Sequence, residues 1–342
     1  MRIIVVGLGG TIAMTGHRNG GVAPTLSASE LVEAVPGLSE AGIELDVRSF
    51  RNRPGAALTL GDLGELLSLL RESFAAGAAG AVVTQGTDTI EETAYALSLL
   101  HTGDEPIVVT GAMRNPTLAG ADGPANLSAA VRVAADPGAR GLGCLVVLAD
   151  EIHAADRVRK THTTSVATFA SPNGGPLGYL AEGRAHLLNR PARRYTLPGE
   201  SLAAPARGTR LPAVPTADDG PLAAPARVTL YTATLGDDGS LLPLLAERSD
   251  GLVIAALGVG HVPESWVPHL EAAARRIPVV LASRTGGGRV ATSTYGYPGA
   301  ERDLIARGLI PAGFLDPYKA RLLLQILLTA GHPDIPGAFA HS

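Results

Sequence analysis

The stretch that decides the fold is Val82-Val83-Thr84-Gln85-Gly86-Thr87-Asp88-Thr89-Ile90-Glu91-Glu92-Thr93-Ala94. An apolar run leads into Gly86, and helical character begins near Asp88 or Thr89. A strand followed at once by a helix is the repeating unit of an α/β protein with a parallel sheet. Asp88, or the threonine before it, is a suitable N-cap, and Glu91 follows Asp88 at capping-box spacing.

The same alternation continues on both sides of this stretch. Short apolar runs, most of them rich in valine or isoleucine, predict strands over 2–8, 43–49, 81–84, 106–110 and 144–148. Apolar residues at three- and four-residue steps predict helices over 29–35, 60–76, 90–100 and 124–135. We therefore expect an α/β fold whose large N-terminal domain is built on a doubly wound parallel sheet.

The character of the chain changes after residue 183. A proline- and alanine-rich stretch predicts a linker over 184–226. A second α/β pattern follows it, with strands expected over 228–233, 252–256 and 278–282 and helices near 264–276, 301–307 and 317–330. The predicted organisation is an N-terminal catalytic domain over 1–183, the linker, and a smaller α/β C-terminal domain over 227–342.

Composition excludes several classes of protein. The 342 residues carry a net charge of −4, so no basic field exists for nucleic-acid binding. The single cysteine, Cys144, excludes a disulfide framework and a cysteine metal site, and its apolar surroundings predict a buried thiol. No apolar run approaches the length of a membrane span, and the first one is too short for a signal peptide. We expect a cytoplasmic protein. A leader peptide removed before residue 1 would not be seen in this numbering.

A glycine-rich turn follows the first predicted strand. The segment reads Gly7-Leu8-Gly9-Gly10-Thr11-Ile12-Ala13. A dinucleotide-binding turn needs glycine or alanine where Ile12 stands, and a loop rather than a helix is predicted after it. What the turn presents is the Thr11 hydroxyl, at the end of a strand where α/β sheets bind ligands. The alternative is a threonine that only ends the strand.

A lysine in a basic segment is the next candidate. Only Lys160 and Lys319 are lysines among the 28 basic residues, so 26 are arginines. Lysine can release its proton and act as a base, whereas arginine cannot. Separately, the Thr87 hydroxyl and the Asp88 carboxylate stand at the carboxyl end of a predicted central strand, where open α/β sheets bind their ligands. The alternative is a solvated basic loop.

Taken together, these segments resemble the bacterial-type L-asparaginase/glutaminase family of threonine-dependent amidohydrolases. The motifs are colinear over nearly the whole chain and comprise 9–13, 86–94, 110–114 with 121–124, 160–164, 169–173 with 175–178, and 319–324. The resemblance implies the two-domain fold expected above, a small amide substrate, and no metal or organic cofactor. It also implies a homotetramer, a dimer of dimers, whose sites lie between the N-terminal domain of one subunit and the C-terminal domain of its neighbour.

The resemblance also implies roles for individual residues. Thr11 corresponds to the nucleophile that attacks the amide carbon. Lys160 takes a proton from Thr87, directly or through water, while Asp88 orients the lysine and meets the substrate α-amino group. Backbone N–H groups near Thr87 are candidates for an oxyanion hole. The residues implied to bind substrate are Ser49, Gly86, Thr87, Asp88 and Ala112.

The chain departs from the family pattern in three places. The loop over 14–25 contains no tyrosine, and Val22 or a neighbour stands in its place. Phe50 stands where the family has a glutamine. The segments 231–235 and 293–297 offer no acidic residue. The side chains that we consider as replacements are Tyr295, Tyr297 and His17, whereas His162 and His261 are expected to be hydrogen-bonded scaffold residues.

Three functions remain open at this point. The first is hydrolysis of the side-chain amide of L-asparagine to L-aspartate and ammonia through a threonine acyl-enzyme. The second is an amidase for glutamine, D-asparagine or a larger amide. The third is a catalytically silent amino-acid-binding protein on the same scaffold.

Overall fold

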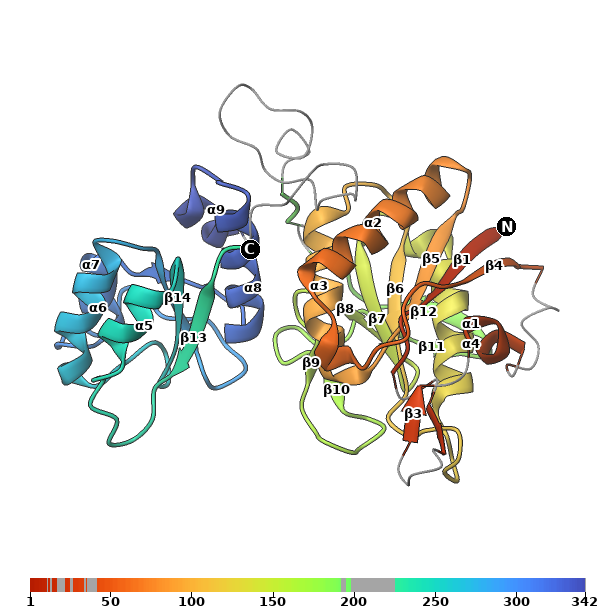
Figure 1. The fold of residues 1–342 in the computed structure, drawn as a ribbon, viewed down its shortest axis with the longest axis horizontal. Helices are drawn as coiled ribbons and strands as arrows, with labels where there is room; N and C mark the ends of the chain where they lie inside the picture. Colours follow the sequence, from red (N-terminus) through yellow and green to blue (C-terminus); the bar gives the residue numbers. More distant parts are fainter. Residues whose placement is uncertain are drawn as a thin grey trace. The chain divides into compact units, whose positions relative to one another are not determined.

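The computed structural model describes residues 1–10, 12, 14–16, 22–24, 27–33, 35, 42–191, 195–197 and 225–341. These residues form two units, each an α/β structure with its own sheet (Figure 1). The first unit runs from Met1 to Leu197, and the second contains the described residues from 225 onward. Thr11 and His17 lie outside the described residues.

The sheet of the first unit has eight strands in the order β12-β11-β8-β7-β6-β5-β1-β4. Their bounds are β1 (Arg2–Gly7), β4 (Glu44–Ser49), β5 (Gly80–Thr84), β6 (Ile107–Thr110), β7 (Cys144–Leu148), β8 (Glu151–Ala154), β11 (Gly178–Ala181) and β12 (Arg184–Leu187). The five predicted strands are all present, and from β4 to β7 they pair in parallel.

The sheet is mixed, however, because three antiparallel strands extend it beyond β7. Only Ala149 and Asp150 connect β7 to β8, both with positive φ, 50° and 63°. A two-residue connection of this kind forms a hairpin, so β8 must run antiparallel to β7. The turn contains no glycine, which is why the sequence did not signal it.

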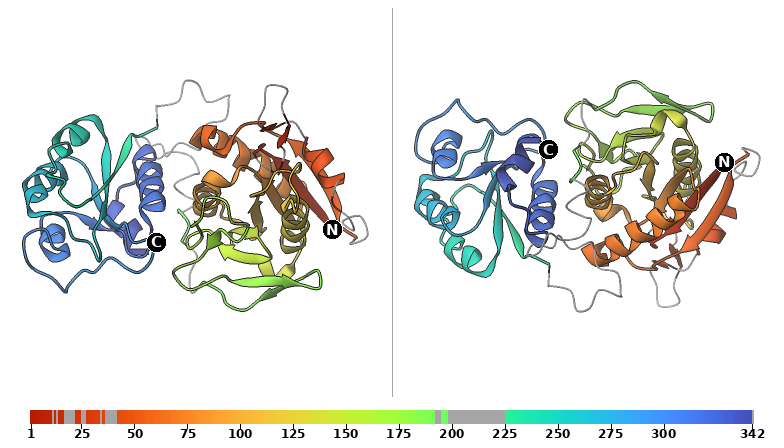
Figure 2. Two further views of the ribbon diagram at one scale, coloured as in Figure 1. Left: turned by 90° about the horizontal axis from the view of Figure 1, so that it is seen from below. Right: turned by 90° about the horizontal axis from the view of Figure 1, so that it is seen from above.

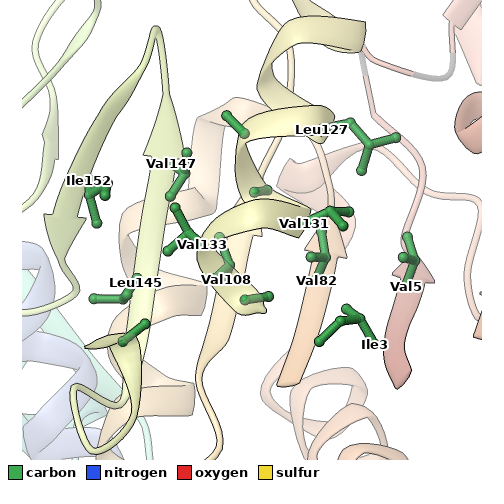
Figure 3. Packing of buried hydrophobic residues seen from close by; sticks show 14 of the residues in the cluster. Ile3, Val5, Val82, Val108, Leu127, Val131, Val133, Leu145, Val147 and Ile152 are labelled. Atoms are coloured by element: carbon green, nitrogen blue, oxygen red, sulfur yellow. The ribbon is translucent and has the colours of Figure 1, made fainter. Parts of the chain in front are cut away.

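Helices cover both faces of this sheet, as predicted. Helices α2 (Leu60–Ala75) and α3 (Ile90–Leu100) contact each other, and α3 lies on β6 and β7. Helices α1 (Ala28–Glu33) and α4 (Gly123–Ala134) contact each other, and α4 packs on β5, β6 and β7. Figure 3 shows the core under α4, where Leu127, Val131 and Val133 lie over apolar strand residues.

Local sequence explains where α2 begins. The Thr59 hydroxyl accepts the N–H of Asp62, and the Asp62 carboxylate accepts the N–H of Thr59, which completes a capping box. The remaining short elements of this unit are β2 (Met14–Gly16), β3 (Val22–Pro24), β9 (Arg159–Lys160), β10 (Phe169–Ala170), η3 (Gly55–Ala57), η4 (Thr87–Thr89) and η5 (Pro137–Ala139). Strands β2 and β3 pair antiparallel, so the loop predicted after residue 13 contains a short hairpin.

The second unit is a four-stranded parallel sheet between two layers of helices. Its strands, in the order β13-β14-β15-β16, are β13 (Val228–Thr232), β14 (Gly251–Ala256), β15 (Val279–Ser283) and β16 (Ile310–Pro311). Its helices are α5 (Leu242–Arg248), η7 (Glu264–Trp266), α6 (Val267–Ala274), α7 (Glu301–Ala306), α8 (Pro317–Thr329) and α9 (Ile335–His341). Helices α8 and α9 lie on one side of this sheet, and α5, α6 and α7 lie on the other (Figures 1 and 2).

The core of the second unit centres on Trp266. This indole is fully buried, donates its Nε1–H to the carbonyl oxygen of Asp237 (2.9 Å) and stacks on Tyr231. The elements α5, α9 and β16 were not predicted from the sequence. None of the described helices is both long and apolar enough to cross a membrane. Cys144 is buried, as expected.

Residues 198–224 of the predicted linker lie outside the described part of the chain. Strand β12, which the predicted boundary places in that linker, pairs with β11 in the large sheet. The domain limits 1–183, 184–226 and 227–342 otherwise stay predictions.

Candidate active site

Several loops emerge together at the carboxyl edge of the large sheet. Gly7 pairs with Ser49 of β4 on one side and with Thr84 of β5 on the other, and Thr84 pairs with Thr110 of β6. The loops that follow β1, β4, β5 and β6 therefore start side by side. Open α/β sheets bind their ligands at this edge.

Lys160 lies at the centre of a hydrogen-bonded group there. Its Nζ is 3.0 Å from the Thr87 Oγ1 and 2.7 Å from the Asp88 Oδ1. The lysine comes from β9, more than 70 residues after the other two. Lys160 is 16% exposed and Thr87 is buried, whereas the Asp88 carboxylate is 71% exposed. The group thus joins a buried hydroxyl to an accessible carboxylate through one amine.

The capping role expected for Asp88 and Glu91 is wrong. Helix α3 begins at Ile90 with Thr89 as its N-cap, and no side chain caps it. A 3-10 turn, Thr87–Thr89, separates Asp88 from the helix, so its carboxylate pairs with Lys160 instead. Glu91 is buried, and its Oε2 lies 3.8 Å from Arg159 Nε. A charged partner is a stronger attraction for a carboxylate than a backbone N–H.

Glycines let the loop after β1 pack directly against the loop after β5, without any side chain between them. Gly10 has a φ of 87°, and a Cβ on it would lie 2.1 Å from the backbone nitrogen of Gly86. Gly86 is also close to Gly55: a Cβ on Gly86 would lie 2.9 Å from the backbone nitrogen of Gly55. Gly10, one peptide bond before Thr11, therefore packs directly on the residue one peptide bond before Thr87. Thr11 itself is outside the described residues.

The loop after β6 forms another wall of the site. A Cβ on Gly111 would meet the carbonyl oxygen of Gln85 at 2.5 Å and the Thr87 Cγ2 at 3.3 Å. The next residue, Ala112, is fully buried. The Asp122 carboxylate accepts the backbone N–H groups of the two residues that follow Ala112, at 3.0 and 2.8 Å. The carboxylate fixes this wall rather than capping α4, for which no side-chain cap bond exists.

Asn126 is a supporting residue that the sequence analysis missed. Its buried side chain donates to the carbonyl of Gly111 (2.9 Å) and accepts the N–H of Ala149 (3.0 Å). It also donates to Asp122 (3.0 Å). One amide thus ties the loops after β6 and β7 together. A polar residue on the buried face of an amphipathic helix was the available signal.

At the end of β4 the chain has Ser49 and then Phe50, where the family has a serine and then a glutamine. Ser49 is exposed, and its Oγ accepts the N–H of Ala28 at the start of α1 (3.2 Å). The ring of Phe50 lies under the Arg51 guanidinium, 4.3 Å from its Cζ. Arg51 also binds Asp62. Ser49 thus lies at the predicted edge, while Phe50 is engaged in a cation–π contact.

His162 and His261, the two histidines expected to be hydrogen bonded, do form hydrogen bonds. The Nδ1 of His162 accepts the N–H groups of Thr164 and Ser165, both at 3.0 Å. In the second unit, the ring nitrogens of His261 lie 2.9 Å from the Tyr297 hydroxyl and 3.2 Å from the Glu301 Oε2. Whether Tyr295 or Tyr297 replaces the missing loop tyrosine stays a prediction.

The described residues contain no group of three or more histidine, cysteine, aspartate or glutamate side chains suited to a metal ion. The chemistry that these side chains can supply themselves is proton transfer between a hydroxyl and an amine, beside a carboxylate that fixes the amine.

Comparison with known proteins agrees with the geometry. Residues 2–193 match the family Asparaginase, N-terminal, and residues 227–336 match the Glutaminase/Asparaginase C-terminal domain. The chain belongs to the asparaginase family. It is 36% identical to a Probable L-asparaginase of Deinococcus radiodurans over 335 residues, which cover 96% of this chain and 94% of that protein.

Two further members of the asparaginase family extend this comparison. A Glutaminase-asparaginase of Pseudomonas aeruginosa is 30% identical, over 96% of this chain and 86% of that protein. The crystal structure of a Probable Cytoplasmic L-asparaginase from Campylobacter jejuni has 30% identity and a TM-score of 0.82, with 99% of both chains covered. The asparaginase fold and amidohydrolase class predicted from the sequence are therefore confirmed.

Proposed function

We propose that this chain hydrolyses the side-chain amide of L-asparagine to L-aspartate and ammonia. The observation that carries the proposal is the pair of contacts from Lys160 Nζ to Thr87 Oγ1 and Asp88 Oδ1, at 3.0 and 2.7 Å. The asparaginase names of the relatives support the choice of substrate.

The proposed reaction has two steps. In the first, the Thr11 hydroxyl attacks the amide carbon, its proton passes to the leaving nitrogen, and ammonia leaves an ester between Thr11 and the aspartyl group. In the second, water attacks that ester. Thr87 takes the proton of this water and passes its own hydroxyl proton to Lys160 in the amine form. As the bond between the carbonyl carbon and the Thr11 oxygen breaks, the proton held by Lys160 returns through Thr87 to Thr11, and aspartate leaves.

The support for Thr11 comes from its neighbours in the chain. Gly10 lies against Gly86, and Ile12 is buried beside Gly123, where a Cβ would lie 2.8 Å from the Ile12 Cγ1. A nucleophile positioned next to a base can gain several orders of magnitude in rate. Backbone N–H groups near Thr87 are proposed to bind the developing oxyanion.

The remaining site residues are proposed to bind the amino acid. Asp88 uses one carboxylate oxygen for Lys160, and its exposure leaves the carboxylate accessible to the substrate α-ammonium group. Gly86, Ser49 and Ala112 are proposed to line the rest of the substrate site at this edge. Phe50 has no hydrogen-bonding group and its ring already contacts Arg51, so it cannot replace the amide, and Ser49 is the hydroxyl proposed to bind the substrate here.

Glutamine is the second candidate substrate. The Pseudomonas aeruginosa relative is named for both activities. Rates of ammonia release from L-asparagine, L-glutamine and D-asparagine, measured side by side, decide between them. Binding of one of these amides without ammonia release would instead support a silent binding protein.

We further propose that the protein is a cytoplasmic homotetramer built as a dimer of dimers. The named relative from Campylobacter jejuni is described as cytoplasmic, which supports the location. Light scattering of the purified chain tests the assembly.

The proposed mechanism is tested by four variants and one control. Thr11→Ala and Thr87→Val each remove a hydroxyl, and Lys160→Met removes the base; we expect kcat to fall by about 10²–10⁴-fold in each. Lys160→Arg keeps the positive charge beside Asp88 but cannot release a proton, so it should not rescue activity. Thr89→Val removes a neighbouring hydroxyl that binds Gly55 instead, and it should stay within a few-fold of wild type.

Hydroxylamine gives an independent measurement of the acyl-enzyme. With it present, the wild type should form a hydroxamate, and Thr11→Ala should form none. Full activity in both Thr11→Ala and Thr87→Val would show that the assigned roles are wrong.

A further inference from the structure

A second group of titratable side chains lies in the second unit, at the carboxyl edge of its sheet. His261 follows β14 and pairs with Leu257 in an isolated bridge. Its Nδ1 lies 2.9 Å from the hydroxyl of Tyr297, and its Nε2 lies 3.2 Å from the Glu301 Oε2. Glu301 is the first residue of α7 and is fully buried. A hydroxyl, an imidazole and a carboxylate thus stand in line.

The buried carboxylate of Glu301 determines which ring nitrogen of His261 carries the hydrogen. Burial raises the pKa of Glu301, but the N–H groups of Tyr295 and Thr294, at 2.7 and 2.8 Å, outweigh it and hold the pKa below its ordinary value. An ionised carboxylate only accepts, so the neutral His261 ring must carry its hydrogen on Nε2. The lone pair is then on Nδ1, and the Tyr297 hydroxyl donates to it.

Tyr231 shows what a different partner does to a phenol. Its hydroxyl donates to the Asp237 carboxylate at 2.6 Å, and this bond raises the pKa of Tyr231 to about 12. That phenol keeps its proton. Tyr297 donates instead to a nitrogen that can take the proton and become an imidazolium ion, which Glu301 then stabilises.

We propose that Glu301, His261 and Tyr297 form a nucleophilic relay, which makes Tyr297 a site that takes acyl groups from small activated esters. The arrangement has the three parts of an activated nucleophile: the attacking oxygen, a base within hydrogen-bond reach, and a group that orients the base. This inference goes beyond the proposed amide hydrolysis and does not depend on it.

The acyl transfer needs only these residues and the ester. The Tyr297 oxygen attacks the ester carbonyl while its proton passes to His261 Nδ1. The carbon–oxygen bond to the leaving alcohol then breaks, and the imidazolium returns the proton to that alcohol. The product is an acyl-tyrosine ester, with His261 neutral again.

The phenol is accessible to such a reagent. Tyr297 is 50% exposed and Tyr295 is 44% exposed. The Tyr295 ring meets His261 edge-on, with centroids 4.9 Å apart, so it holds the imidazole without hydrogen bonding to it. Tyr295 is therefore a matched control, because it has similar exposure and the same neighbourhood but no base at its hydroxyl in the described contacts.

The test is acetylation by p-nitrophenyl acetate, followed by peptide mass spectrometry. The reaction is run in the Thr11→Ala variant, so that acylation of the proposed hydrolase nucleophile does not consume the ester. We expect Tyr297 to be acetylated about 100-fold faster than Tyr295, the low end of what a positioned base contributes. Tyr179, 44% exposed and stacked on His186, should react as slowly as Tyr295.

Two substitutions test the relay itself. His261→Gln removes the base and should reduce labelling of Tyr297 to the level of Tyr295. Glu301→Gln should reduce it as well, but Glu301 also holds two backbone N–H groups, so circular dichroism must first show that this variant folds. Equal labelling of Tyr297 and Tyr295, or undiminished labelling of Tyr297 in folded His261→Gln, would overturn the proposal. Loss of amide hydrolysis in Thr87→Val, with Tyr297 labelling intact, separates the two activities.

Discussion

The contact between Gly10 and Gly86 gives a sharp prediction for Gly10→Ala. A Cβ at position 10 would lie 2.1 Å from the Gly86 nitrogen, 2.4 Å from its Cα and 2.6 Å from the carbonyl carbon of Gln85. All three are backbone atoms, so none can rotate away as a side chain can. Carbon contacts shorter than about 3 Å essentially do not occur in packed interiors, so the two loops must separate by about 1 Å.

The expected magnitudes follow from that displacement. A shift of about 1 Å in a positioned catalytic group costs on the order of 100-fold in rate, so kcat should fall by about that factor. The φ of 87° adds strain of roughly 1–2 kcal/mol for alanine, and overpacking adds roughly 1–3 kcal/mol. We therefore expect the free energy of unfolding to fall by about 2–5 kcal/mol.

The matched control is Gly77→Ala. Gly77 has a φ of 91°, close to that of Gly10, but a Cβ there would have nothing within 4 Å. It isolates the conformational strain, so it should lose only about 1–2 kcal/mol and keep its turnover. Ammonia release and urea unfolding measure both quantities. If Gly10→Ala keeps more than half of wild-type kcat and is no less stable than Gly77→Ala, the reasoning about the loop contact is refuted.

Three further predictions concern other parts of the molecule. Burial lowers the pKa of His153 from 6.5 to about 4, so the unfolded chain binds more protons between these values. The free energy of unfolding should therefore fall by about 3 kcal/mol as the pH falls from 6.5 to 4, and by less in His153→Gln. Urea unfolding at several pH values measures this, and an equal fall in the two proteins would contradict it. Asn126→Ala leaves the Gly111 carbonyl and the Ala149 N–H without these bonds, at about 1–3 kcal/mol each, so it should cost about 2–6 kcal/mol, which an unchanged unfolding midpoint would disprove. If Tyr295 or Tyr297 supplies the phenol absent from segment 14–25, changing both to phenylalanine should lower turnover about 100-fold, and unchanged turnover removes that idea.

Periodic segments were predictable because local pattern and tertiary packing agree there. Helix α3 has the predicted bounds, and α2 ends one residue early, since each buries an apolar stripe on the sheet. The parallel strands were equally clear, because they are buried on both faces. The antiparallel extension was not, since its turn has no glycine and places Ala149, a residue that rarely adopts a positive φ, beside Asp150.

The candidate site was predictable where topology alone brings residues together. Thr87 and Asp88 end a central strand, and Lys160 was singled out by its rarity; the structure places all three within hydrogen-bond distance. The capping assignment of Asp88 failed because it used only local spacing, whereas a lysine 72 residues away competes for the carboxylate. Asn126 was missed for the same reason, since its partners are the ends of other strands.

The two lysines have a practical consequence for chemical labelling. Lys319 is completely enclosed and paired with Asp316, and Lys160 shows only a small part of its surface. Amine reagents therefore find the α-amino group of Met1, which is 58% exposed, but no well-exposed lysine, and the lysine that they reach first is Lys160 of the candidate site. Protection of that amine by an added amino acid would report occupancy directly, and polymer conjugation through lysine would inactivate this protein where it leaves lysine-rich ones intact.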